Sequence, residues 1–200
     1  MPTNDLQPDI NFLYEMGNIR FIQRTWRRFI SPDLGNLAEH HFRVFWIAMV
    51  IAAKEHKGDT GKIGKMAMLH DIAESRAGDV DMISRQYVIR NEELGISDIL
   101  GSTSLEKEFL DLWREYEDRT SIEAKIVKDA DNLDVDFELA EQASNGSSLS
   151  NNLAEMRDFV GSNKLYTKTA KEMYKQLKAS NPHAWWLTGR NRRTSGDWQK

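Results

Sequence analysis

The longest apolar run of the chain covers residues 42–53 and is interrupted only by Arg43. Its length, and the lack of strict alternation between apolar and polar positions, predict a helix that crosses the core and not a strand. Just before this run, Asn36 and Glu39 have the spacing of a capping box, which marks the start of a helix. The sequence therefore predicts a buried central helix over residues 37–56.

Apolar residues elsewhere recur mainly at helical spacing, and no segment alternates like a strand for more than a few residues. We therefore expect an all-α fold, a helical bundle around the central helix. Three later positions carry the capping-box pattern: Thr103 with Glu106, Thr120 with Glu123, and Asn152 with Glu155. The predicted helices cover residues 7–28, 37–56, 62–75, 81–93, 104–117, 121–144 and 152–179. The joints between them, each with a glycine, are expected at 58–61, 78, 95–101 and 145–148.

Length and composition suit one domain, because 200 residues with 40% hydrophobic content can bury a single core. The most loop-like stretch, residues 145–152, is followed by more apolar residues at helical spacing. We interpret it as a surface loop and not as a domain boundary. The expected organisation is a single domain over residues 1–188 and a polar, Arg-rich tail over residues 189–200.

The charges are almost balanced, with 27 Lys and Arg against 31 Asp and Glu, so no broad positive field attracts a nucleic acid polymer or an anionic membrane. The chain has no apolar run of the ~18 residues that a membrane span needs, and its start lacks the layout of a signal peptide. The expected location is the cytoplasm. Because the chain has no cysteine and five histidines, any metal site must use His, Asp and Glu.

Three short segments carry candidate metal ligands: His40 at the start of the central helix, the pair His70 and Asp71, and the acidic run at 128–131. Apolar neighbours surround the pair, so its charges would be partly buried and would need partners. A divalent cation such as Mn, Co, Fe, Zn or Mg satisfies neutral imidazole and ionised carboxylate together. The sequence thus indicates a metal site built from three helices.

Two further carboxyl groups lie near this predicted site. Glu74 follows His70 by four residues and so shares its helical face, where it can orient a water or protonate a leaving oxygen. Asp79 follows Gly78, where the chain is expected to turn, and can enter the same cavity. Both are candidate proton-transfer groups.

The order and separation of His40, His70, Asp71 and Asp131 resemble the H…HD…D signature of the HD-domain metal-dependent phosphohydrolases. The context LAEHHFRVFWIA, MLHDIAESRAGD and KDADNLD is similar to the 5′-deoxynucleotidase branch, which includes YfbR-like enzymes and the HD-domain-containing protein 2 group. The resemblance covers roughly residues 15–145 and implies an all-helical, usually dimeric enzyme. Such enzymes release phosphate from deoxynucleoside 5′-monophosphates.

The resemblance implies a role for each matching residue. His40, His70, Asp71 and Asp131 would bind one divalent metal ion, and Glu74 and Asp79 would act as catalytic acids. Arg24, Trp26 and Arg85 would contact the substrate, with Trp26 against the sugar. We also expect a homodimer, a small nucleotide as substrate, and no nucleic acid or membrane partner.

Several alternatives stay open at this point. Asp129 and Asp134 compete with Asp131 as the last ligand; Asp134 shares its face, whereas Asp129 is expected on the solvated side. His41 is expected to pack beside the site, and His56 and His183 to be incidental. The segment 58–65 lacks the spacing of a phosphate-binding loop. The rival functions are a nucleoside triphosphate triphosphohydrolase on the same scaffold and a metal-binding module that senses a nucleotide without turnover.

Overall fold

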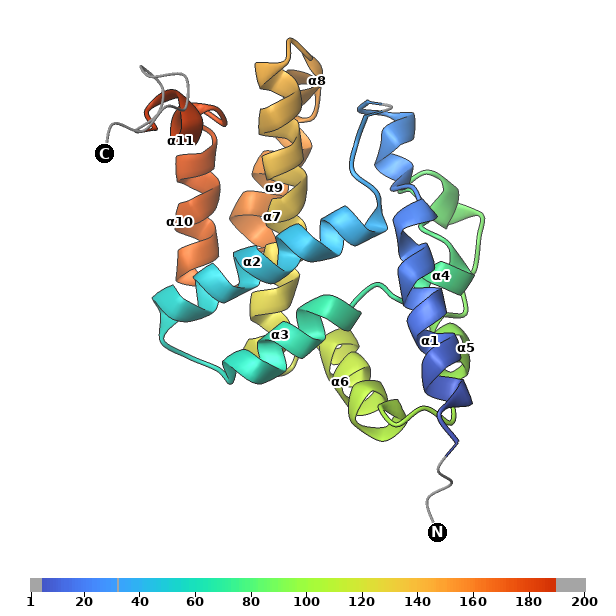
Figure 1. Cartoon of the computed structure of the whole chain (residues 1–200). Coiled ribbons are helices and arrows are strands. Elements are labelled where there is room, and N and C mark those ends of the chain that lie inside the picture. The colour runs from blue at the N-terminus through green and yellow to red at the C-terminus, as the bar shows by residue number, and fades with distance from the viewer. Residues whose placement is uncertain (1–4, 32, 190–200) are drawn as a thin grey trace, which may run out of the picture.

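Figure 1 shows the computed structural model, which describes residues 5–31 and 33–189. Regular structure in these residues is helical, apart from an isolated antiparallel bridge between Gln23 and Asn36, so the all-α prediction is confirmed. The α-helices are α1 Gln7–Asn18, α2 Leu37–Glu55, α3 Thr60–Leu69, α4 Glu74–Ala77, α5 Glu92–Leu100, α6 Glu106–Asp118, α7 Ile122–Ser144, α8 Leu149–Asn152, α9 Ala154–Asn163, α10 Lys168–Leu177 and α11 Ala184–Leu187. Three 3₁₀ helices are η1 Ile19–Phe21, η2 Thr25–Arg28 and η3 Ser84–Gln86. Residues 190–200, nearly all of the predicted tail, lie outside the described residues.

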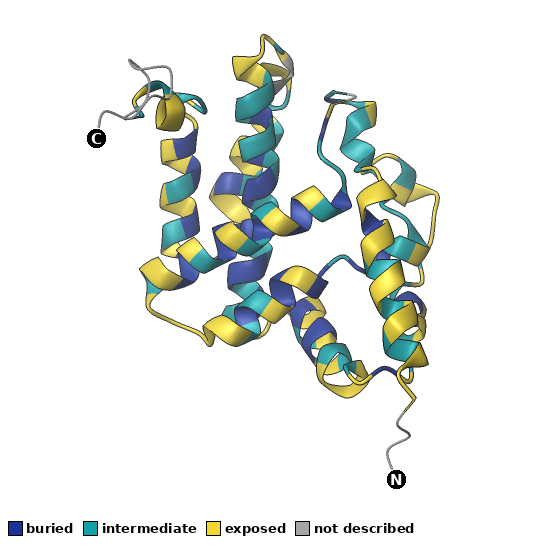
Figure 2. Cartoon of the chain, in the orientation of Figure 1, coloured by how far each residue is buried: buried dark blue, intermediate teal, exposed yellow. Residues whose placement is uncertain are grey.

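Helix α2 crosses the long helix α7 at the centre of the molecule and packs against both α7 and α3 (Figure 1). Its inner face is buried in the main core, as Figure 2 shows by the dark bands along it. The outer face is not: Phe42, Trp46 and Val50, spaced four apart, are 66%, 54% and 46% exposed. The predicted central helix is therefore confirmed, but it is buried on one side only.

The start of α2 is fixed by the predicted capping box. Asn36 Oδ1 accepts a hydrogen bond from the Glu39 backbone N–H at 3.1 Å, and Glu39 Oε2 accepts one from the Asn36 N–H at 2.8 Å. This reciprocal pair satisfies two amide groups that the first helical turn leaves without partners. It also sets the position of His40, which follows one residue later in the first turn.

The predicted helix over 7–28 is wrong in its second half. Helix α1 ends at Asn18, and the chain continues through η1 into an extended stretch in which Ile22 O accepts from Leu37 N at 2.9 Å. The pairing holds this stretch against the start of α2. As a result Arg24 and Trp26 come close to the first turn of the central helix, which a continuous helix would not have allowed.

The predicted helices over 62–75 and 81–93 also differ from the structure. The first is divided into α3 and the short α4, with a turn at 70–73. The second is replaced by loop and η3, and the helix forms instead as α5, where a glycine-containing joint was expected. The Asn91 side chain caps α5 by accepting a hydrogen bond from the Leu94 N–H at 3.1 Å, so the helix begins at Glu92. It continues through Gly95, where a Cβ would lie at an ordinary contact distance of 3.4 Å from the Ala73 backbone oxygen.

The helices expected over 104–117 and 121–144 correspond to α6 and α7 within two residues at each end. The helix expected over 152–179 is divided into α9 and α10, and α8 occupies part of the predicted loop at 145–152. Three of the four predicted capping boxes are wrong. Ser121 caps α7 in place of Thr120, and α6 and α9 begin after Leu105 and Leu153 without a side-chain cap.

Within the described residues, no helix combines the length and the apolar character that crossing a bilayer demands.

Candidate active site

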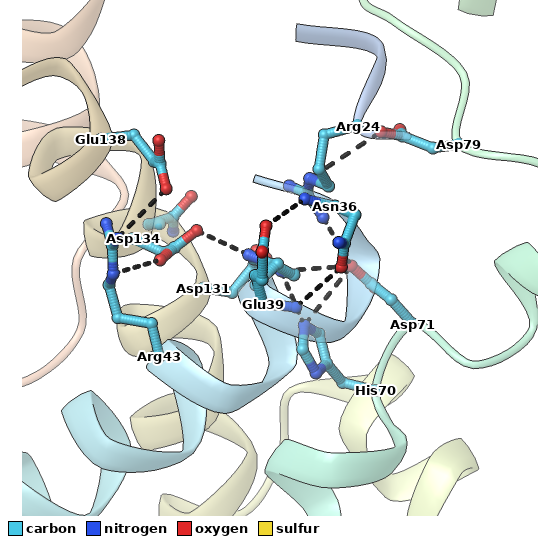
Figure 3. A network of polar contacts seen from close by, with 12 residues as sticks. Arg24, Asn36, Glu39, Arg43, His70, Asp71, Asp79, Asp131, Asp134 and Glu138 are labelled. Atoms are coloured by element: carbon cyan, nitrogen blue, oxygen red, sulfur yellow. Dashed lines mark hydrogen bonds and ion pairs between the residues drawn. The ribbon is translucent and has the colours of Figure 1, made fainter. Parts of the chain in front are cut away.

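Four of the predicted site residues meet at the centre of the fold. His40 comes from α2, His70 and Asp71 follow α3, and Asp131 lies on α7. One ligand atom from each lies within 4.8 Å of the others, and Figure 3 shows the labelled side chains of His70, Asp71 and Asp131 pointing toward one another. His40 Nε2 lies 3.2 Å from His70 Nε2 and 3.4 Å from Asp131 Oδ1, while Asp71 Oδ2 is 3.5 Å from the same His40 nitrogen.

The two imidazoles are oriented by their other nitrogens. His40 Nδ1 lies 2.7 Å from Asp134 Oδ2, and His70 Nδ1 lies 2.7 Å from the Ala67 carbonyl oxygen. Since a carboxylate and a carbonyl only accept hydrogen bonds, both Nδ1 atoms are the donors. In the neutral rings the two Nε2 lone pairs then face each other and the carboxylates. Such a set of two nitrogens and two oxygens fits a divalent cation, with Asp134 and Ala67 as the groups that hold the ligands in place.

The pKa values of the two histidines are shifted in opposite directions. Burial and the charge of Arg24 oppose protonation of His40, but contacts with Asp131, Asp134 and Asp71 outweigh them and raise its pKa well above the ordinary value. The pKa of His70 is lowered, chiefly by burial. Without a metal, His40 therefore carries the positive charge that this carboxylate-rich cluster needs, in the position where a cation would bind.

Both candidate ligand carboxylates are held ionised. Burial opposes ionisation of Asp71, but His70 and His40 hold its pKa far below the usual range. Burial likewise opposes ionisation of Asp131, and Lys128 and His40 overcome it. The two carboxylates are thus already in the ionised state that a metal requires of its ligands, whereas His40 must give up its proton to bind one.

Glu74 lies at the start of α4 and is buried. Its Oε1 accepts a hydrogen bond from Arg90 Nη1 at 3.2 Å, while its Oε2 has no partner among the described residues. Burial, together with the neighbouring charges of Asp71 and Asp79, raises the pKa of Glu74 to about 9. At neutral pH this carboxyl therefore holds a proton that it can give to another group.

Asp79 follows Gly78, whose positive φ of 78° confirms the predicted turn. The Asp79 Oδ2 atom accepts a hydrogen bond from the Thr25 backbone N–H at 2.7 Å and lies 3.8 Å from Arg24 Nε. Arg24 Nη1 is in turn 3.4 Å from Asp71 Oδ2 (Figure 3). Asp79 thus holds the Arg24 segment against the metal-ligand cluster.

Every predicted site residue except His40 and His70 lines one cavity of about 290 Å³. Trp26 forms part of its wall and packs against a small apolar cluster that contains Ile30 and Leu34. Arg85 is exposed, and its Nε donates to the Val80 carbonyl at 2.8 Å. The cavity therefore combines acidic groups with guanidinium groups and an aromatic ring.

The structure also corrects and extends the prediction. Asp129, expected on the solvated side, is fully buried and accepts hydrogen bonds from residues 166 and 167. His41 packs as expected, with its ring 4.7 Å from that of His70. Lys128 was missed, although it precedes Asp131 by three residues and so shares its helical face; its Nζ lies 2.6 Å from Asp131 Oδ2. Arg90 was also missed, because the sequence places it in the helix expected over 81–93, whereas the structure has it in the loop before α5.

Comparison with known proteins agrees with this geometry. Residues 16–195 match the sequence family described as HD domain. The human protein named 5′-deoxynucleotidase HDDC2 is 32% identical over 161 residues, which cover 76% of this chain and 75% of that protein. The yeast protein from Saccharomyces cerevisiae named 5′-deoxynucleotidase YGK1 is 27% identical over 186 residues, 86% of this chain and 84% of that protein.

Two solved structures share the fold. A conserved hypothetical protein from Pyrococcus furiosus has a TM-score of 0.68 and 25% identity, and the match covers 86% of this chain and 99% of that one. A protein from Magnetospirillum magnetotacticum, described as a predicted metal-dependent phosphohydrolase, has a TM-score of 0.71 and 20% identity, over 90% and 93% of the two chains. The chain therefore belongs to the HD domain family and is an enzyme of the 5′-deoxynucleotidase-like type.

Proposed function

We propose that this enzyme is a metal-dependent phosphohydrolase that removes phosphate from deoxynucleoside 5′-monophosphates. The observation that carries the proposal is the convergence of four donor atoms within 4.8 Å beside a cavity that also contains Arg24 and Trp26. The relatives named 5′-deoxynucleotidase support the choice of substrate. They also favour monophosphates over the triphosphates that we considered from the sequence.

In this proposal His40, His70, Asp71 and Asp131 hold one divalent cation. When bound there, such a cation lowers the pKa of a water and neutralises negative charge on a phosphate. Mn, Co, Mg, Fe and Zn all accept a set of two imidazoles and two carboxylates, so the donor atoms alone do not select among them.

Arg24 and Trp26 are proposed to bind the two groups on either side of the reacting bond. Arg24 binds the phosphate, and Trp26 binds the sugar. Arg24 already lies beside Asp71 and Asp79, and its guanidinium can donate to phosphate oxygens while remaining beside these carboxylates. Trp26 would pack against the deoxyribose and leave no room for a 2′-hydroxyl. Arg85, exposed at the cavity, would contact the substrate from the solvent side.

Glu74 is proposed to supply the proton that the leaving 5′-oxygen needs. Its raised pKa, about 9, keeps the carboxyl protonated at neutral pH, and its Oε2 has no partner among the described residues. Asp79 holds the backbone of Thr25 and so keeps Arg24 near the phosphate. Both residues thus act in the reaction, Glu74 by proton transfer and Asp79 by holding Arg24 in place.

A substrate panel tests the proposal. The purified protein is incubated with Mn²⁺ or Co²⁺ and with mono- and triphosphates in ribo and deoxy forms, and the products are separated as phosphate, pyrophosphate and triphosphate. Phosphate from deoxy monophosphates, with the ribo forms cleaved more slowly, is the expected result. Triphosphate released from nucleoside triphosphates would replace the proposal with the triphosphohydrolase. Tight binding without any product would replace it with the sensor.

A homodimer is also part of the proposal. The exposed side chains of Phe42 and Trp46 on α2 and of Trp185 and Trp186 on α11 line one groove of about 940 Å³, which offers an apolar surface to a second copy. Light scattering during gel filtration should give about twice the monomer mass of 23.1 kDa. The cytoplasmic location and the lack of a nucleic acid partner stay predictions from the sequence.

A further inference from the structure

Lys128 contacts a candidate metal ligand directly, and the proposed mechanism gives it no role. The two oxygens of Asp131 face different neighbours: Oδ1 lies 3.4 Å from His40 Nε2, and Oδ2 lies 2.6 Å from Lys128 Nζ. A single carboxylate therefore separates this ammonium group from the histidine cluster. Lys128 also lines the cavity that contains the other site residues.

Each carboxylate of the cluster has its own cation. Asp71 is paired with Arg24, from the extended segment before η2, and Asp131 is paired with Lys128, from α7. Both cations line the same cavity. A phosphate group that lies in the cavity beside the two carboxylates therefore meets one cation next to each of them. This placement suits a phosphate, whose several oxygens can accept hydrogen bonds from two cations at once.

Other cations in the cavity wall are held by structural partners. Arg90 donates to Glu74 and to the Gly78 carbonyl and pairs with Glu92, while Arg157 donates to both oxygens of Asp136. Lys128 differs, because Asp131 is its one hydrogen-bond partner in the described part of the chain. An ammonium group has three N–H donors, so Lys128 can bind another acceptor without losing Asp131.

A second positive group stands near Lys128 in the same wall. The charge of Arg119 acts on Lys128, and its guanidinium carbon lies 3.5 Å above the ring of Tyr116. One guanidinium nitrogen of Arg119, Nη1, is buried without a partner among the described residues. Arg119 is also paired with Glu117 at 3.6 Å, but both Lys128 and Arg119 line the cavity and have N–H donors that no described residue accepts, which favours the binding of an anion there.

We propose that Lys128 is a second phosphate-binding catalytic residue, which donates a hydrogen bond to a phosphate oxygen of the substrate while Arg24 binds the phosphate beside Asp71. The inference rests on the proposed function. In the reaction the oxygen of water bonds to phosphorus, the bond from phosphorus to the 5′-oxygen breaks, the leaving oxygen takes the proton of Glu74, and the proton that the attacking water gives up restores protonated Glu74. Lys128 stabilises the charge on the phosphate oxygens throughout this exchange.

The test compares Lys128→Met, Lys128→Arg and Lys125→Met. The last is a matched control, because Lys125 lies one turn earlier on α7 and does not line the cavity. Calorimetry measures the Kd for Mn²⁺, and then the Kd for inorganic phosphate on the Mn-loaded protein. Circular dichroism verifies the fold of each variant, and Lys128→Gln replaces Lys128→Met if the latter does not fold.

Losing a charged hydrogen bond predicts that Lys128→Met weakens phosphate binding by ~10- to 100-fold and lowers kcat/KM at least as much. Lys128→Arg should recover most of the phosphate binding, and Lys125→Met should match the wild type. The Kd for Mn²⁺ should change by less than about threefold. Wild-type phosphate binding in Lys128→Met would overturn the inference. It would also be overturned if the phosphate loss is matched by an equal loss of Mn²⁺ affinity, which would make Lys128 a positioning residue for Asp131.

The two proposals fail in different ways. If the wild type cleaves deoxy monophosphates and Lys128→Met does so equally well, the role of Lys128 is wrong and the proposed function stands. If the wild type cleaves none of them but binds phosphate through Lys128, the proposed function is wrong and the phosphate site at Lys128 stands.

Discussion

Asp129 and Asp131 lie two residues apart on α7 in contrasting surroundings. Asp129 is fully buried and accepts three hydrogen bonds of 2.7 to 2.8 Å, from the backbone N–H groups of Tyr166 and Thr167 and from the Thr167 hydroxyl. Asp131 has His40 and Lys128 as partners and shares its cluster with the acidic Asp71. The protein itself supplies the hydrogen-bond donors for the Asp129 carboxylate, whereas the Asp131 carboxylate lies in a cluster with a second negative charge, that of Asp71.

This difference separates a structural carboxylate, Asp129, from Asp131, which we propose as a metal ligand. Asp129 connects α7 to the start of α10, where Thr167 is the capping residue, and it is fully buried with both carboxylate oxygens already accepting hydrogen bonds. At the other site Asp71 and Asp131 raise each other's cost of ionisation, and only His40, His70 and nearby cations keep both charged. Bringing two buried carboxylates together costs free energy, and a bound cation would offset this cost. The cluster is therefore where a cation is expected.

The largest effect should come from breaking the cluster. Asp71→Ala removes one of the proposed ligand oxygens, so we expect loss of bound metal and a fall in turnover of at least about 10³-fold, equivalent to about 4 kcal/mol. The helical circular dichroism should remain, since Arg24 keeps Asp79 as a partner. Metal content by mass spectrometry and turnover measure the result. A variant that retains metal and full rate would show that Asp71 is not a ligand.

Glu74→Gln should separate catalysis from metal binding. The change keeps the shape of the side chain and removes the proton, so turnover should fall by ~10²- to 10³-fold while metal content stays at the wild-type value. Steady-state kinetics and metal analysis on one preparation make the measurement. Unchanged kcat, or a parallel loss of metal, would contradict the role given to Glu74.

Asp129→Ala should give the opposite outcome to Asp71→Ala. Two backbone N–H groups lose their acceptor, so the free energy of unfolding should fall by ~2 to 4 kcal/mol, whereas turnover at low temperature should stay near the wild-type value. Urea denaturation measures the stability. Asp129→Asn is the control: its amide oxygen keeps one acceptor, and an intermediate loss is expected. If Asp129→Ala lost bound metal and kept the wild-type stability, Asp129 would be the metal ligand and not the structural residue.

Metal binding should depend on pH through His40. Its raised pKa means that the metal-free protein holds a proton at pH 7 that the metal must displace, so metal affinity should rise about tenfold per pH unit up to that pKa. The same proton stabilises the metal-free fold most below pH ~6.5, and this contribution is lost as pH rises through the folded pKa.

Calorimetry in buffers of different ionisation enthalpy counts the protons released. The Glu74→Gln variant lacks the other proton that a cation can displace. It should therefore release about one proton for each metal ion bound. Release of none would contradict the protonated His40.

Local rules were enough to predict part of the molecule. The capping box at Asn36 and Glu39 involves residues within one helical turn, and the structure reproduces it. Glu74 lines the cavity as expected, but the helical face that it was predicted to share with His70 is wrong, because a turn at 70–73 separates α3 from α4. The long helix α7 was predicted within two residues because its apolar pattern continues without interruption. Where the position of a helix depends only on residues within it, the sequence pattern is sufficient to predict the helix.

The errors come from contacts between distant segments. Asp129 was placed on the solvated side because its own helix does not reveal that residues 166 and 167 cover it. Helix α5 was missed because Gly95 is read as a break, whereas in the structure it is buried within the helix, against residue 73. Lys128 was overlooked because its importance comes from the cavity it shares with Arg24, which lies a hundred residues away in the chain.

The most direct test of the account is the position of the metal. Crystals soaked in Mn²⁺ and measured above its absorption edge should show a single strong anomalous peak, surrounded by His40, His70, Asp71 and Asp131, with no peak at Asp129. Asp71→Ala crystals treated in the same way should show none. A peak elsewhere, or no peak in the wild type at saturating Mn²⁺, would contradict the claim that these four residues form the metal site.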